Sequence, residues 1–296
     1  MKRRVSFIKT FICMSLCVLL LSFFSIISMA ETTSFANDTE GDTAADIIST
    51  EEETTIPEEE PSAIEQFFEK LKNDLYRTFI KDSRYKHITN GLIVTLEITF
   101  VALLIGLALG FVIAIICATN TKNGTLKIPA LICKAYLTIF RGTPVIVQLL
   151  IIYYLWLGKF GWGETYVAMI AFGLNSAAYI AEIVRSGIMS IDNGQFEAGR
   201  SLGFNYVQTM LHIVLPQAFK NVLPALANEF ISLLKETSVA SFIAVKDMMK
   251  GANVIVGVTY NMVIPYLTVA LIYLVMVIIL TKLVSLLERR LRNSEH

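Results

Sequence analysis

The sequence predicts an all-α membrane protein with five core transmembrane helices, preceded by an export signal and an amphipathic helix. Three observations lead to this fold class. The 296 residues are 54% hydrophobic and only 17% charged. Several apolar runs reach the roughly 20 residues that cross a bilayer as a helix. Between them lies one polar segment that carries helix-start and helix-end signals but is too polar to be a span.

The zero net charge conceals an asymmetry along the chain. Residues 31–63 contain many Asp and Glu and no Lys or Arg, so the remainder is basic. The basic residues are dispersed at the edges of the apolar runs, which argues against a nucleic-acid partner. The four cysteines have no metal-ligand spacing and do not form the pattern of an exported disulfide framework.

The N-terminal 61 residues are expected to lie outside the folded domain. Residues 1–30 have the basic start, apolar centre and small-x-small end (Ser28, Ala30) of a signal peptide. An uncleaved signal anchor is the alternative, because the apolar run is long. The acidic segment 31–61 has almost nothing to bury and is predicted to be a disordered linker.

An amphipathic helix is predicted over residues 62–82. Apolar residues recur at spacings of three and four, opposite Glu65, Glu69 and Lys72. Such a helix is suited to lie on the membrane surface, in contact with lipid, or against the bundle.

The membrane domain is predicted over residues 88–288, followed by a basic cytoplasmic tail at 289–296. Its five spans are residues 91–118, 128–157, 166–184, 222–234 and 262–287. Pro144 lies inside the second span and is expected to kink or restart that helix. Residues 239–260 are expected to be less regular, with a short apolar run at 239–245.

The orientation follows from counting the spans outward from a cleaved signal. The multi-pass chain then lies in the plasma membrane with its mature N-terminus outside and its C-terminus in the cytoplasm. Lys122, Lys127 and the terminal arginines agree with the positive-inside bias. Lys81, Arg84 and Lys86 disagree, because they fall outside.

The polar segment between the third and fourth spans, residues 190–216, is predicted to be helix, glycine turn, helix at the cytoplasmic face. Asp192 with Gln195 and Asn205 with Gln208 have the spacing of capping boxes. Gly203 is expected to end the first helix in the left-handed conformation. Pro216 suits the first turn of the next helix.

This segment resembles the EAA loop of permease subunits in binding-protein-dependent ABC importers. The matching positions have the spacing of the E-A-A, G and I-x-L-P pattern: Glu197, Ala198, Gly199, Gly203, Ile213, Leu215 and Pro216. Gly199 departs from the pattern, which has a second alanine there, and is expected to loosen the helix by about 1 kcal/mol. We refer to residues 190–216 as the EAA-like loop.

The resemblance extends over most of the mature chain, to the polar amino acid permeases that take up histidine, glutamate, glutamine or arginine. It is carried by Thr95-Leu96-Glu97, by Arg141-Gly142-Thr143-Pro144, by Asn175-Ser176-Ala177-Ala178-Tyr179 with Glu182 and Arg185, and by the segment 223–238. It implies a type I importer fold and a second permease subunit, identical or related. It also implies cytoplasmic ATPase subunits, an extracellular solute-binding protein and an amino acid substrate.

ATP chemistry is expected in a partner rather than in this chain. The sequence contains no Gly-x-x-x-x-Gly-Lys-Ser/Thr loop of the kind that holds ATP phosphates. We therefore expect no enzyme activity and no cofactor here, with ATP and Mg bound by the ATPase. In the resembling family the EAA loop couples the two proteins, and Glu197 is expected to make polar contacts at that joint.

The candidate translocation path consists of polar residues inside or at the edge of the predicted spans: Glu97, Asn175, Ser176, Tyr179, Glu182 and Glu229. Each such residue is costly at a helix centre and is therefore a functional candidate. Asn175, Tyr179 and Glu182 share one helix face, which could line a passage for a zwitterion. Interhelical hydrogen bonding is an equally weighted alternative. Arg141 and Lys235 are expected to pair or snorkel rather than bind solute.

Two other classes of function compete with the importer. A secondary transporter or channel that works alone would need ion relays and commonly an internal repeat, and no convincing repeat is present. A membrane sensor or assembly scaffold would use the acidic linker and the amphipathic helix as its active parts.

Overall fold

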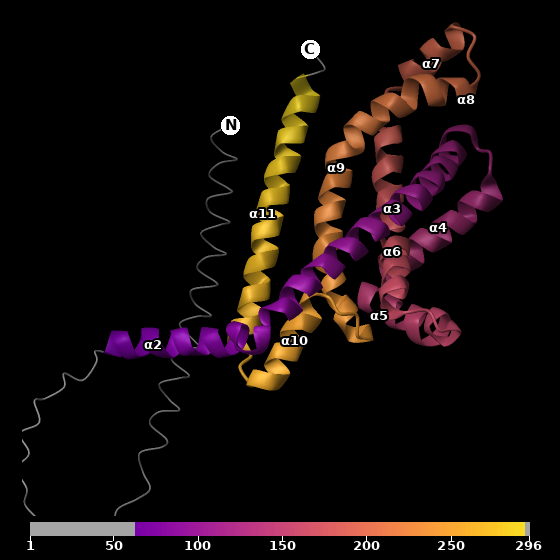
Figure 1. Cartoon of the computed structure of the whole chain (residues 1–296). Coiled ribbons are helices and arrows are strands. Elements are labelled where there is room, and N and C mark those ends of the chain that lie inside the picture. Colours follow the sequence, from indigo (N-terminus) through magenta and orange to yellow (C-terminus); the bar gives the residue numbers. More distant parts are fainter. Residues whose placement is uncertain (1–62, 294–296) are drawn as a thin grey trace, which may run out of the picture. The chain divides into compact units, whose positions relative to one another are not determined.

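The computed structural model describes residues 63–293, all of them in or between helices, with no β-strand among them. The predictions for the signal peptide and the acidic linker, and for residues 294–296 of the tail, lie outside the described residues. Pro61–His296 form one compact unit, and Figure 1 shows its helices in chain order.

The amphipathic segment is helical but divided. Helix α2 (Ala63–Leu75) passes into a π-helical turn at Tyr76–Ile80 and a 3₁₀ turn at Lys81–Ser83. Asp82 and Ser83 have φ of 56° and 53°, the left-handed region, so the chain breaks direction before the first span. In Figure 1, α2 runs across the direction of α11 rather than along it.

The first span, α3 (Tyr85–Asn123), is longer than predicted at both ends. The predicted span 91–118 lies inside this helix, which begins six residues earlier. Gly91 lies inside the helix, where a Cβ would stand 2.5 Å from the Asp247 carbonyl oxygen. This glycine therefore permits a close helix contact instead of ending the helix. The loop predicted at 119–127 is reduced to three residues, Gly124–Leu126, before α4 begins.

The second span is broken, as Pro144 predicts. Helix α4 (Lys127–Gly142) ends before Thr143, and α5 (Val145–Ile151) follows Pro144. A π-helical turn at Ile152–Trp156 and a 3₁₀ turn at Leu157–Phe160 continue α5. The two halves, Lys127–Gly142 and Val145–Phe160, meet at 110°. We call Thr143 and Pro144 the α4–α5 break.

Helix α6 (Glu164–Met189) is the centre of the bundle, with 72% of its most apolar window buried. It packs on α3 through small residues spaced four apart on α3, namely Ala102, Gly106, Gly110, Ala114 and Ala118, all of them buried. A Cβ at Gly110 would stand 2.9 Å from the Ile180 Cβ. The two helix backbones approach closely because these side chains are small, as in other membrane bundles.

The C-terminal half contains α9 (Leu215–Glu236), α10 (Met248–Thr259) and α11 (Val263–Asn293). The region expected to be irregular instead contains a 3₁₀ turn at Thr237–Ile243 followed by α10. The signal overlooked was Asp247, whose Oδ1 accepts from the Lys250 N–H at 2.8 Å and starts that helix.

The described residues contain three helices long and apolar enough to cross a membrane, and the bent α4–α5 pair brings the number to four. Helix α9 is about 33 Å long at ~1.5 Å per residue, which is long enough to span. It is not identified by composition because it also carries Lys220, Glu229 and Lys235.

Candidate functional site

The EAA-like loop folds as helix, turn, helix. Helix α7 (Asn193–Ser201) is capped by Asp192, whose Oδ1 accepts from the Gly194 N–H at 2.6 Å. Gly203 has φ +82° and donates its N–H to the Arg200 carbonyl, while the Phe204 N–H donates to the Gly199 carbonyl. This pair of bonds is a Schellman motif, and it satisfies carbonyls that the helix end would leave free.

The second helix of the loop begins with the predicted capping box. Asn205 Oδ1 accepts from the Gln208 N–H, and Gln208 Oε1 accepts from the Asn205 N–H, both at 2.9 Å. The predicted box at Asp192 and Gln195 does not form. Gln195 Oε1 instead accepts from Gln217 Nε2 at 3.2 Å, which ties α7 to the start of α9.

Pro216 does not begin a separate helix. Helix α8 (Tyr206–Thr209) continues through a π-helical turn at Met210–Val214 directly into α9, with Pro216 in its first turn. A proline ring collides with the carbonyl four residues earlier, here that of His212. The wider π-helical turn contains His212 and gives the ring room, so the helical run bends there instead of ending.

The residues that match the EAA pattern divide by exposure. Glu197, Ala198, Gly203 and Pro216 are exposed, and Ile213 and Leu215 are half-buried. Gly199 is buried, and a Cβ there would stand 2.5 Å from Thr209 Oγ1 and 2.6 Å from Thr209 Cγ2. The departure from the second alanine therefore has a local cause, because α7 packs too closely on α8 for a methyl group.

A lysine from α3, 71 residues earlier in the sequence, contacts the start of α7 and holds it in place. Lys122, in the last turn of α3, donates to Asn193 Oδ1 at 2.5 Å, and its Nζ lies 4.9 Å from the centroid of the Phe196 ring. Phe196 in turn stacks on Tyr206, with centroids 6.1 Å apart. Burial raises the pKa of the Tyr206 phenol. A cavity of about 330 Å³ opens beside this contact, lined by residues that include Lys122, Glu197 and Arg200.

The α4–α5 break faces Asn175 of α6. Gln148 Nε2 donates to the Phe140 carbonyl in the last turn of α4 at 2.8 Å, and to the carbonyl of Thr143, the residue after α4, at 2.9 Å. Asn175 Nδ2 donates to Gln148 Oε1 at 2.9 Å. Both amides are buried. A helix that ends inside a membrane needs such partners, because no water reaches its free carbonyls.

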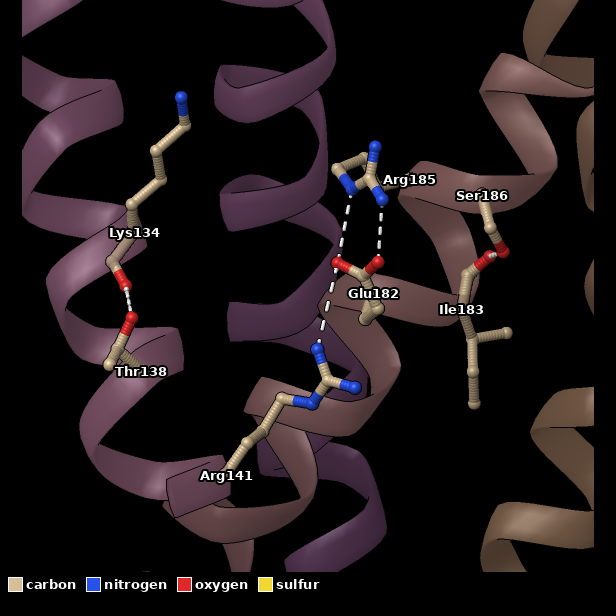
Figure 2. Close-up of polar contacts among 7 residues, drawn as sticks. All are labelled: Lys134, Thr138, Arg141, Glu182, Ile183, Arg185 and Ser186. Carbon is tan, nitrogen blue, oxygen red and sulfur yellow. Dashed lines mark hydrogen bonds and ion pairs between the residues drawn. The ribbon is translucent and has the colours of Figure 1, made fainter.

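Glu182 lies about two helical turns beyond Asn175 on the same face, between two arginines (Figure 2). Its carboxylate accepts from Arg185 Nη2 at 2.5 Å and Nε at 3.0 Å, and Arg141 Nη1 of α4 lies 3.9 Å away. The Arg141 guanidinium also lies 5.8 Å from the centroid of the Tyr179 ring. Arg141 therefore pairs as predicted, and Asn175, Tyr179 and Glu182 all face the α4–α5 pair. Glu182 and Tyr179 are accessible, with 31% of the Glu182 side chain and 37% of Tyr179 exposed.

The other path candidates do not join this group. Ser176 is buried and donates to Glu229 Oε1 of α9 at 3.0 Å. Glu97 is exposed on α3, without a hydrogen bond or ion pair to any of residues 63–293.

Sequence reasoning missed Gln148, Lys122 as an anchor, and Thr209. Gln148 could have been noticed as an amide in the first turn after a mid-span proline. Neither Lys122 nor Thr209 had such a signal in the sequence. Lys122 contacts Asn193, 71 residues later in the chain, and Thr209 packs against Gly199 across the glycine turn. Within residues 63–293 no group of three or more His, Cys, Asp or Glu side chains is placed to hold a metal ion.

Comparison with known proteins identifies the family. Residues 110–293 match the model of the binding-protein-dependent transport system inner membrane component. The chain is 40% identical over 210 residues to the arginine transport system permease protein ArtQ of Bacillus subtilis, covering 70% of this chain and 94% of that protein.

Solved structures agree with this assignment. A crystal structure of an amino acid ABC transporter with histidines matches with a TM-score of 0.65 and 42% identity, over 72% of this chain and 98% of that one. An inward-facing structure of the MetNI methionine ABC transporter has a TM-score of 0.62 at 20% identity, over 69% and 95%, and supports the fold alone. The chain therefore belongs to the inner membrane components of binding-protein-dependent transport systems, with the type I ABC importer permease fold.

Proposed function

We propose that this chain is the transmembrane permease subunit of an ABC importer for polar amino acids. The observation that carries the proposal is the EAA-like loop, a doubly capped helical turn with an exposed Glu197. The 40% identity to an arginine permease supports the substrate class. ATP hydrolysis would occur in a separate ATPase, and an exported binding protein would deliver the solute.

The proposed orientation puts the EAA-like loop, the α3–α4 connection and the C-terminus in the cytoplasm. The Lys122–Asn193 contact supports the first two, because it joins the end of α3 to the start of α7. Figure 1 draws the C-terminal end of α11 on the side of α7 and α8, away from α2 and α10. Arg289 and Arg290 then lie inside, in agreement with the positive-inside bias.

The coupling step would pass through α7 as a rigid element. An exposed helix of nine residues can seat in a groove of the ATPase. Two side-chain contacts tie it to the bundle, from Lys122 of α3 and from Gln217 of α9. A displacement of α7 would therefore move α3 and α9 together, a rigid-body transition between two packings.

The candidate path is the accessible part of the α6 face. The Glu182 carboxylate suits the ammonium of an amino acid, and Arg141, held at 3.9 Å, is the looser of its two partners. A bound zwitterion could exchange with Arg141, its carboxylate on the guanidinium and its ammonium on Glu182. Asn175 already donates to the buried Gln148 and Ser176 to the half-buried Glu229, which favours a packing role for both.

The test is uptake by a reconstituted complex, in which this chain is combined with a candidate ABC ATPase and a candidate solute-binding protein from the same organism. A panel of labelled arginine, histidine, glutamine and glutamate is expected to show ATP-dependent uptake of at least one. Glu197→Lys and Gly203→Val should insert normally and reduce uptake at least tenfold. Glu288→Lys, a charge reversal near the C-terminus, serves as the control.

Two results would overturn the proposal. Uptake by the purified chain without any ATPase would favour a secondary transporter. Normal ATP-driven uptake by both loop variants would remove the coupling role from the EAA-like loop. For the path, Glu182→Gln should weaken solute-stimulated uptake, and a silent Glu182→Gln would exclude Glu182 from solute binding.

A further inference from the structure

Neither coupling nor solute passage accounts for the basic cluster between α2 and α3. Arg77, Lys81 and Arg84 lie at the end of the bundle that carries α2 and α10, away from the EAA-like loop (Figure 1). In the proposed orientation this end is external, where the positive-inside bias predicts few cations. A membrane protein that keeps three cations there needs a local reason for them.

The three cations line one cavity of about 250 Å³. The residues that end α10, including Thr259 and Asn261, form its opposite wall. The lining contains a single carboxylate among the described residues, that of Asp74, so positive charge predominates. Hydroxyl and amide groups beside Arg and Lys are the donors that hold phosphate oxygens in proteins.

Two of the cations have no partner of their own. The Arg84 guanidinium already has partners. Its Nη1 donates to the Arg77 carbonyl at 2.7 Å and its Nη2 to Asp82 Oδ2 at 2.9 Å. Neither Arg77 nor Lys81 forms a side-chain hydrogen bond or ion pair with any of residues 63–293. Their charges are therefore available to an anion in the cavity.

The turn that brings these side chains together is held in an unfavourable conformation. Asp82 and Ser83 adopt the left-handed conformation although neither is glycine, and this conformation is unfavourable for residues that carry a Cβ. The same turn lets Arg84 reach back seven residues to Arg77. The cluster is thus fixed by the fold and does not consist of independent surface side chains.

The side chains near the cavity indicate that it lies at the depth of the lipid headgroups. Tyr76, Tyr85 and Tyr260 are 56%, 44% and 90% exposed around the cavity, and tyrosine is enriched at the membrane–water interface. The apolar side of α2 is also uncovered, with Ile64 69% and Leu75 41% exposed. Such a helix buries its apolar face at the boundary between headgroups and acyl chains.

We propose that this cavity binds the phosphate of an anionic phospholipid, with Arg77 and Lys81 as its charged contacts and the apolar face of α2 against the acyl chains. The phosphate is then held at the depth where α2 lies. An acidic surface of a soluble protein would satisfy the cations but leave the apolar face of α2 uncovered. The inference needs the chain to lie in a membrane, and it is independent of the solute carried and of the ATPase.

The experiment uses the full chain in nanodiscs of phosphatidylcholine alone and in nanodiscs that also contain phosphatidylglycerol, an anionic phospholipid. Native mass spectrometry after transfer to detergent measures phosphatidylglycerol retained per chain. Arg77→Gln/Lys81→Gln should reduce retention by about fivefold per charge removed. Lys70→Gln/Lys72→Gln removes the same charge from exposed positions of α2 and should retain the lipid.

A fold control accompanies the pair. Arg77→Lys/Lys81→Arg keeps both charges and should restore retention, so that a loss in the glutamine variant reports charge and not misfolding. Size-exclusion elution and helical circular dichroism of all variants should match those of the unmodified chain.

Three results would each overturn the proposal. Equal loss in the Lys70/Lys72 variant would mean diffuse attraction to the surface. Displacement of the lipid by millimolar inorganic phosphate would mean a site for free phosphate. Unchanged lipid retention with weakened binding of the solute-binding protein in the Arg77/Lys81 variant would mean a docking surface for an acidic protein.

Discussion

Two of the breaks between helices differ in their surroundings. At Gly203 the interruption lies in the exposed EAA-like loop, and at Thr143–Pro144 it lies inside a predicted span. Both leave helix-end carbonyls without their usual donors. At Gly203 the backbone N–H groups of Gly203 itself and of Phe204 supply the donors, in the Schellman motif. At the α4–α5 break a buried glutamine supplies them, held by an asparagine from another helix.

The comparison shows that access to water decides which residues can satisfy the free carbonyls at a helix end. In water, a local motif suffices, since any remaining polar group can be hydrated. Inside the membrane every group needs a protein partner, so the solution must come from distant residues. Four predictions test this contrast, beginning with the largest effect.

Gln148→Leu should destabilise the bundle most. It removes the donors to the Phe140 and Thr143 carbonyls and the acceptor for Asn175, all in a buried setting. Each buried unpaired group costs about 1–3 kcal/mol, so a total near 3 kcal/mol or more is expected. Thermal unfolding in detergent measures it. Gln217→Leu, at an exposed position, should stay within about 0.5 kcal/mol, and equal losses would remove the contrast.

Lys122→Met should sharpen the comparison by removing the Lys122 side-chain contacts with Asn193 and Phe196, which join the last turn of α3 to the EAA-like loop. A charged hydrogen bond and a cation–π contact are lost, together about 2 kcal/mol. We expect ATPase binding to persist while solute uptake per ATP hydrolysed falls severalfold in the reconstituted complex. Lys127→Met, an exposed lysine a few residues on, should leave that ratio unchanged. The same ratio in both variants would mean that Lys122 transmits nothing.

Alanine at the two glycines beside the interruptions should have effects of opposite sign. Gly203→Ala places a Cβ at φ +82° and should cost about 1–2 kcal/mol. Gly142→Ala meets nothing within 4 Å and has ordinary helical backbone, so it should be neutral or gain up to about 1 kcal/mol. Unfolding temperatures of the two variants decide the matter. A destabilising Gly142→Ala would show that the α4–α5 break also depends on local backbone freedom.

Gly199→Ala should show the smallest effect, because two terms oppose each other. Alanine gains about 1 kcal/mol in helix propensity, and its methyl group collides with Thr209. We expect a net loss of about 1 kcal/mol, recovered when Thr209→Ala is added. A double-mutant cycle on unfolding free energies measures the coupling. A stabilising single variant would mean that α8 moves freely relative to α7.

Prediction from sequence succeeded where the cause was local and failed where it was tertiary. The capping box at Asn205, the left-handed Gly203 and the break at Pro144 each follow from a few neighbouring residues. The close approach of Gly91 to the Asp247 backbone could not be predicted, because the two residues are distant in sequence. Helix α10 was missed for a different reason: its start rests on Asp247, a single capping residue outside any apolar pattern. The candidate path split in the same way, since Asn175 and Glu182 share a face but only the fold buries the first and leaves the second accessible.

The row of alanines and glycines along α3 has a consequence for motion. Side chains this small leave no slack between α3 and α6, so the two helices cannot slide or separate without opening a void along their whole contact. Helices α3 and α6 therefore form one rigid unit. Any conformational cycle must therefore move the helices around this unit. The candidates are the angled α4–α5 pair and α11, of whose most apolar window only 11% is buried.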